Sequence, residues 1–133
     1  MSMQNKVILS IKGGVIATAV FSVLIFLSPY LGFPRLPVWE VLADKLNAPV
    51  LIGWLIHFAI GITLAAIYLF WFKSRLKGSD AVRGMIFSLL PFAAAQAVAI
   101  SGGGFNWLLL AGSLFGHLVY GLVLGLTTKE KTI

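Results

Sequence analysis

The two histidines, His57 and His117, are the side chains of this sequence best suited to chemistry. A neutral imidazole can ligate haem iron, carry a proton or accept a hydrogen bond. Each histidine stands in a pattern of small residues at four-residue intervals, and residues at this spacing share one face of a helix. The small residues of the two patterns are Gly53, Gly61 and Ala65 around His57, and Ser113, Gly121 and Gly125 around His117. The imidazoles are therefore expected on the faces that carry the small residues.

Three interpretations of the histidines are open at this point. In the first, both imidazoles make structural hydrogen bonds in a polar cluster, with Gln96, with Ser113 or with a backbone carbonyl freed by Pro91. In the second, His57 and His117 are the axial ligands of a b-type haem, for which glycine one turn away leaves space beside the flat macrocycle. In the third, they handle protons or ions, although the apolar segments contain no carboxylate as a partner.

Other reactive groups are scarce in this sequence. It contains no cysteine and only four Asp and Glu residues, so disulfides, thiolate metal sites and cysteine nucleophiles are excluded. No nucleophile stands with a base, and no paired carboxylates, metal-spaced cluster or phosphate loop occur. We therefore expect no enzymatic activity.

The elements that must position the histidines are membrane helices. Hydrophobic residues make up 59% of the 133 residues and charged residues only 11%, whereas soluble domains carry about 25% charged residues. The segments 13–34, 46–72 and 84–128 contain no charged side chain at all. With so much of the chain suited to the bilayer, neither a soluble catalytic domain nor a nucleic-acid-binding module is expected.

Crossing about 30 Å of hydrocarbon takes about 20 apolar residues. Four segments meet this requirement and predict an all-α integral membrane bundle of four transmembrane helices, forming a single membrane domain over residues 1–133. The helices are expected at about 13–32, 50–72, 84–100 and 106–127. A short amphipathic helix at about 37–48, with Trp39, Leu42, Ala43 and Leu46 on its apolar face, is expected to lie on the outer membrane surface.

The positions of the cations predict the orientation of these helices. Eight of the ten Lys and Arg residues flank the apolar segments near the two ends of the chain or between the second and third helices: Lys6, Lys12, Lys73, Arg75, Lys77, Arg83, Lys129 and Lys131. By the positive-inside rule, both termini should face the cytoplasm. This topology also accounts for the net charge of +6 without nucleic acid as a partner.

The recurrence of the histidine pattern predicts a duplicated two-helix hairpin. Lys12–Gly13 and Arg83–Gly84 also place a cation and a glycine at the start of the first and third helices. Two such copies would be related by an axis along the membrane normal, and their histidines would be placed to hold one ligand from both sides. The small residues are expected to let helices approach closely. Their complementary surfaces are expected at Gly13, Ala17, Gly84, Ser88 and 93–95.

The segments 53–61 and 112–121 resemble the pattern of small, uncharacterised four-helix bacterial inner-membrane proteins. The resemblance covers most of the chain and implies a multi-pass protein of the bacterial inner membrane, but it implies no activity. We therefore expect a non-enzymatic protein that acts in the lipid bilayer through helix packing, as a homo-oligomer or as an accessory subunit of a larger membrane complex. The alternatives are a haem b-binding electron-transfer module and a small proton- or ion-handling protein.

Overall fold

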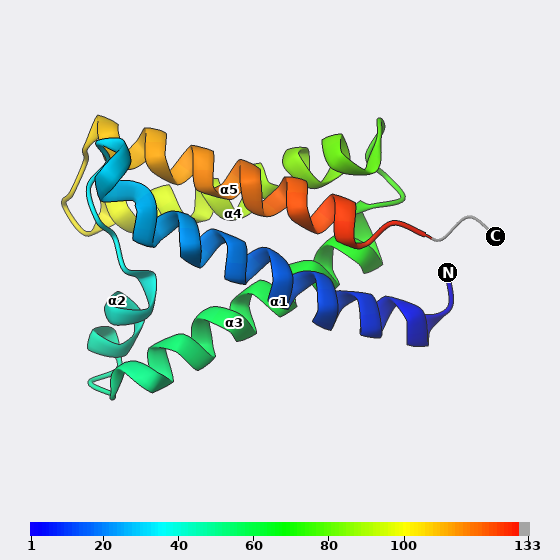
Figure 1. The fold of residues 1–133 in the computed structure, drawn as a ribbon, viewed down its shortest axis with the longest axis horizontal. Helices are drawn as coiled ribbons and strands as arrows, with labels where there is room; N and C mark the ends of the chain where they lie inside the picture. The colour runs from blue at the N-terminus through cyan, green and yellow to red at the C-terminus, as the bar shows by residue number, and fades with distance from the viewer. Residues whose placement is uncertain (131–133) are drawn as a thin grey trace.

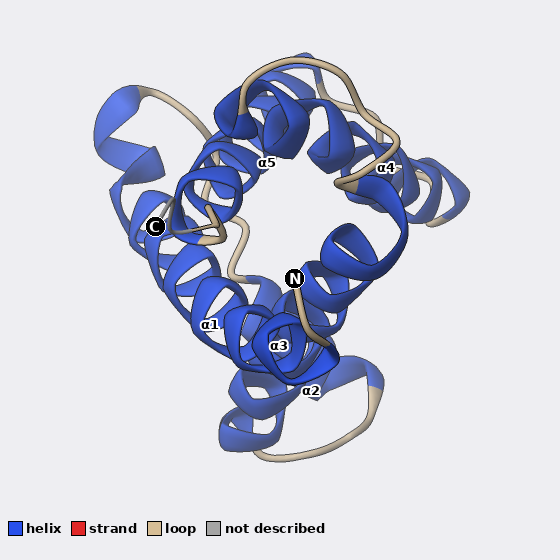
Figure 2. Cartoon of the chain, turned by 90° about the vertical axis from the view of Figure 1, so that its right-hand side faces the viewer, coloured by secondary structure: helices blue, strands red, loops and turns tan. Residues whose placement is uncertain are grey.

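The computed structural model describes residues 1–130, which form helices and connecting loops without a strand (Figures 1 and 2). In chain order the elements are α1 (Met3–Leu27), the 3-10 helix η1 (Ser28–Leu31), α2 (Val38–Lys45), α3 (Val50–Ile67), the π-helical turn η2 (Tyr68–Phe72), α4 (Asp80–Ser101) and α5 (Trp107–Thr127). Four helical segments are long and apolar enough to cross a membrane: Met3–Leu31, Val50–Phe72, Asp80–Ser101 and Trp107–Thr127. The predicted all-α fold with four spans is confirmed.

The first span begins well before residue 13, where the hydrophobic run begins. Ser2 caps α1 by accepting a hydrogen bond from the backbone N–H of Asn5 at 3.2 Å. Lys6 and Lys12 interrupt the apolar run but not the helix, because lysine has a good helix propensity. α4 likewise begins before residue 84, at Asp80. A cation thus marks the end of the apolar segment rather than the end of the helix.

The four spans run antiparallel to their neighbours in sequence (Figure 1). α1 packs against α3 and α5, and α4 packs along α5, whereas α3 and α4 hardly touch each other. The amino end of the chain, the 73–79 connection and the end of α5 lie at one end of the bundle, which we call the proximal end (Figure 1). The 28–49 and 102–106 connections lie at the other, distal end. The proximal position of the amino end and of Glu130 agrees with the 3.7 Å between the Met1 amine and a Glu130 carboxylate oxygen.

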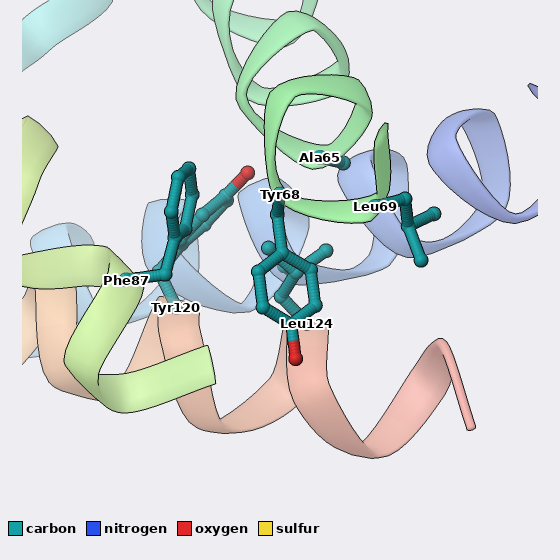
Figure 3. Packing of buried hydrophobic residues seen from close by; sticks show 7 residues of the cluster. Ala65, Tyr68, Leu69, Phe87, Tyr120 and Leu124 are labelled. Atoms are coloured by element: carbon teal, nitrogen blue, oxygen red, sulfur yellow. The ribbon is translucent and has the colours of Figure 1, made fainter. Parts of the chain in front are cut away.

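A cluster of buried apolar side chains closes the proximal half of the bundle (Figure 3). Tyr68 and Leu124 are fully buried, and the ring centroids of Tyr68 and Phe87 are 5.3 Å apart. Tyr68 begins the π-helical turn that follows α3, and its side chain lies in one cluster with Phe87 of α4 and Leu124 of α5. Lys73 follows this turn, lies 3.5 Å from an Asp80 carboxylate oxygen and donates a hydrogen bond to the backbone oxygen of Thr128. These contacts tie the end of the second span to the third and fourth spans.

α2 differs from the predicted surface helix in what covers its apolar face. Trp39 is 2% exposed and stacks on Trp54 of α3, with ring centroids 4.0 Å apart and planes inclined by 11°. Its ring also lies 5.0 Å from that of Phe26 in α1. Ala43 packs against Gly53, where a Cβ would overlap the carbonyl oxygen of Trp39. The aromatic stacking and the close backbone approach place this face of α2 on α3 and α1.

Candidate functional site

The small residues of α3 pack against α1 and α2. A Cβ on Gly61 would overlap the hydroxyl oxygen of Thr18, and a Cβ on Gly14 would lie 2.6 Å from Cα of Ile62. Ala65 is fully buried in the proximal cluster. Gly53, by contrast, meets α2. The small residues of α3 therefore pack against two different helices, α1 and α2.

The small residues of α5 pack mainly against α4. A Cβ on Gly84 would overlap the carbonyl oxygen of Gly121, and a Cβ on Gly121 would overlap the carbonyl oxygen of Gly84. A Cβ on Gly125 would overlap the carbonyl oxygen of Asp80, and Ser88 is fully buried between the two helices. The backbones of α4 and α5 are thus in direct contact over several turns.

The remaining small residues predicted as complementary surfaces are divided. Gly13 faces α5, where a Cβ would lie 2.7 Å from the methyl group of Thr128, and Ala17 is fully buried. The alanines at 93–95 are exposed on α4 instead. The spacing of small residues indicates a helix face without bulky side chains, but it does not show whether a helix of the same chain covers that face.

His57 is 6% exposed and is held by Ser22 of α1, whose Oγ lies 3.0 Å from Nε2 of the imidazole. The single hydroxyl hydrogen of Ser22 is donated to the backbone oxygen of Thr18 at 2.7 Å. Ser22 can therefore only accept from His57, so Nε2 carries the ring proton. Nδ1 of the neutral imidazole is left as a hydrogen-bond acceptor.

His117 forms its hydrogen bond within α5. Its Nδ1 lies 2.7 Å from the backbone oxygen of Ser113, and a carbonyl oxygen only accepts, so Nδ1 carries the proton. Nε2 of His117 is then the acceptor nitrogen. Gln96 of α4 donates to the hydroxyl oxygen of Ser113 at 2.9 Å. Gln96 and His117 thus both contact Ser113, while His57 belongs to a separate network on α1.

Phe21 of α1 contacts both histidines. Its ring centroid lies 6.1 Å from that of His57 and 5.3 Å from that of His117. Phe92 of α4 also lies near His117, with ring centroids 5.8 Å apart. A haem ligated by both imidazoles would need the space that Phe21 fills beside them. The geometry therefore favours hydrogen bonding and packing over shared ligation of a macrocycle.

Both histidines line one cavity of about 200 Å³ between the two hairpins. Its other lining residues come from α1, α2, α3, α4 and α5: Thr18, Phe21, Val38, Ile60, Gly61, Leu64, Pro91, Ala95 and Tyr120. Tyr120 spans the gap between α5 and α3 by donating its hydroxyl to the backbone oxygen of Gly61 at 2.7 Å. The cavity thus lies distal to the proximal cluster, in the part of the bundle where α3 and α4 do not close on each other.

The sequence-based candidates do not include several residues of this region, among them Thr18, Phe21, Ser22 and Tyr120. Ser22 and Tyr120 carry a usable signal, since a polar side chain within an apolar span normally finds a partner on another helix. Phe21 carries none, because one phenylalanine in a phenylalanine-rich sequence does not stand out. Within residues 1–130, no group of three or more His, Cys, Asp or Glu side chains is placed to hold a metal ion.

Comparison with known proteins shows the family of this chain. No curated protein and no solved structure is similar to this chain. A family model described as "Family of unknown function (DUF6789)" matches residues 4–132, nearly the whole chain. This protein therefore belongs to the DUF6789 family.

Proposed function

We propose that this is a small, non-enzymatic, multi-pass membrane protein that works through helix packing, as a homo-oligomer or as an accessory subunit of a larger membrane complex. The observation that carries the proposal is the use of polar side chains inside the spans to join one helix to another. The three pairs are Ser22 with His57, Gln96 with Ser113, and Tyr120 with the backbone of Gly61. Such bonds add to helix association in a medium as apolar as the side chains themselves.

The uncovered side of the bundle supports association with a further helix. α3 and α4 hardly touch, so each has a face without a neighbour from the same chain. On α4 this exposed surface includes the alanines at 93–95. Small residues allow close approach of helix backbones, which is the main source of attraction between helices in lipid.

Mass measurement after purification in mild detergent tests this role. A homo-oligomer is expected to have a protein mass that is a multiple of 14.4 kDa, and an accessory subunit is expected to copurify at fixed stoichiometry with a larger membrane protein. A 14.4 kDa species without any partner, in detergent and in crosslinked bilayers alike, would contradict the proposal. The absorption spectrum of the same sample is expected to lack a Soret band, and a reducible band would favour the haem alternative.

We further propose the bacterial inner membrane as the location, with both termini in the cytoplasm. This orientation is supported by the shared proximal position of the amino end, of Glu130 and of the cationic 73–79 connection (Figure 1). Reporter fusions after Lys77 and Glu130 are expected to be cytoplasmic, and fusions near Asp44 or Gly103 external. An external signal after Lys77 would reverse the orientation.

A further inference from the structure

We propose that the cavity between the two hairpins is a binding site for a lipid-soluble phenol, a single aromatic ring that carries a hydroxyl donor. This role goes beyond helix packing. It rests on the size of the cavity, on its opening between α3 and α4, and on the hydrogen-bonding groups that line it.

The size of the cavity fits one aromatic ring. An apolar cavity of about 150 Å³ in a protein core is large enough to bind benzene. This cavity, at about 200 Å³, has room for a benzene ring with a hydroxyl and a short alkyl group. It has no room for a haem macrocycle.

The cavity opens sideways, toward the surroundings of the bundle. Two of its lining residues, Ile60 on α3 and Ala95 on α4, are exposed. They stand on the two helices that hardly touch, so they mark an opening between these helices. In a membrane this opening faces the acyl chains of the lipid. A ligand that enters here must therefore be soluble in lipid.

The polar groups of the cavity favour a ligand that donates a hydrogen bond. The hydrogen bonds to Ser22 and Ser113 leave Nδ1 of His57 and Nε2 of His117 as acceptors. Thr18 also lines the cavity, and its buried hydroxyl oxygen has no hydrogen-bond partner in the described part of the chain. A phenol hydroxyl can donate to an imidazole nitrogen and accept from such a hydroxyl.

The rest of the lining suits the aromatic ring. Phe21 contacts both imidazoles and lines the cavity, and Tyr120 closes its proximal side through its bond to Gly61. Aromatic rings prefer edge-to-face or offset contacts with one another, and such contacts add to the effect of apolar burial. The site therefore combines two acceptor nitrogens with an apolar, partly aromatic wall.

Titration of the full chain in lipid nanodiscs with 4-ethylphenol and with its methyl ether, 4-ethylanisole, tests the proposal. Empty nanodiscs measure partition of the probes into lipid. The phenol is expected to bind saturably and at least tenfold more tightly than the ether, which has nearly the same shape but no donor. Equal binding of both probes, or no saturable binding of the phenol above the lipid background, would overturn the proposal.

Variants test whether the phenol binds in the cavity or elsewhere on the protein. Ala95→Phe fills the opening and is expected to abolish phenol binding, while Ala97→Phe, also exposed on α4 but outside the cavity lining, is expected to leave it unchanged. His117→Asn keeps a donor at the position of Nδ1 but removes the acceptor Nε2, so it is expected to weaken phenol binding about tenfold. Unchanged phenol affinity in both Ala95→Phe and His117→Asn would show that the phenol binds elsewhere.

Discussion

The Gly121→Leu variant is expected to lose the packing of α4 against α5, with a fall of about 3 kcal/mol in the free energy of unfolding. A Cβ at this position would overlap the carbonyl oxygen of Gly84 and lie 2.7 Å from Cβ of Ser88. A helix backbone cannot turn aside as a flexible side chain can, so the whole helices must separate. The separation would remove contacts at Gly84 and Gly125 as well as at the substituted residue.

Thermal unfolding in detergent measures this effect against a matched glycine. Gly104→Leu is the control, because a Cβ at Gly104 has its nearest neighbour at 3.9 Å, which is ordinary van der Waals contact. Gly61→Leu is expected to act on α1 and α3, through the side chain of Thr18. Equal melting temperatures for Gly121→Leu, Gly104→Leu and the parent would show that the backbone contact between α4 and α5 does not stabilise the protein.

The four spans follow from the sequence because hydropathy and charge act at the scale of a whole helix. About 20 apolar residues between cationic segments leave no other structure that satisfies the backbone in lipid. The true start of α1 at Met3 does not follow from this criterion, since a helix continues into water wherever its residues and its cap permit.

The repeat pattern does not predict which helix each small residue packs against. Residues four apart define a face of a helix. In the structure a Cβ on Gly61 would overlap the side chain of Thr18, and a Cβ on Gly121 would overlap the backbone of Gly84. What meets the face depends on how the helices are arranged in space. Gly53 meets the short α2 for this reason, while the alanines at 93–95 are exposed.

The histidine partners depend in the same way on the register between helices. The bond from His57 to Ser22 joins residues 35 positions apart in the chain, and no local pattern connects them. The hydrogen bond from His117 to Ser113 lies within one helix turn, so it can be predicted from the sequence. Phe21 lies beside His57 as Phe92 lies beside His117. Phe21 lies still nearer to His117, at 5.3 Å, so the ring pairs do not decide whether the hairpin is duplicated, and the duplication stays a prediction.

Opposite responses to glutamine and asparagine are expected at the two histidines. The amide nitrogen of glutamine falls near the position of imidazole Nε2, and that of asparagine near Nδ1. His57→Gln should therefore keep the hydrogen bond to Ser22, whereas His57→Asn should lose it. At His117 the order is reversed, because the bond to the backbone oxygen of Ser113 is made by Nδ1. A lost bond at a buried site costs about 1 to 3 kcal/mol.

Melting temperatures of the four variants, measured in one detergent, test this assignment of the ring protons. Each pair of variants has the same two chemical groups, so the difference within a pair reports where the donor stands rather than how polar the side chain is. If glutamine were the better replacement at both positions, His117 would be bonded through Nε2, and the acceptor nitrogen that we assign to the cavity would be the wrong one. If neither replacement mattered at either position, the two imidazoles would contribute by shape alone, and the hydrogen bond from His57 to Ser22 would not hold α1 against α3.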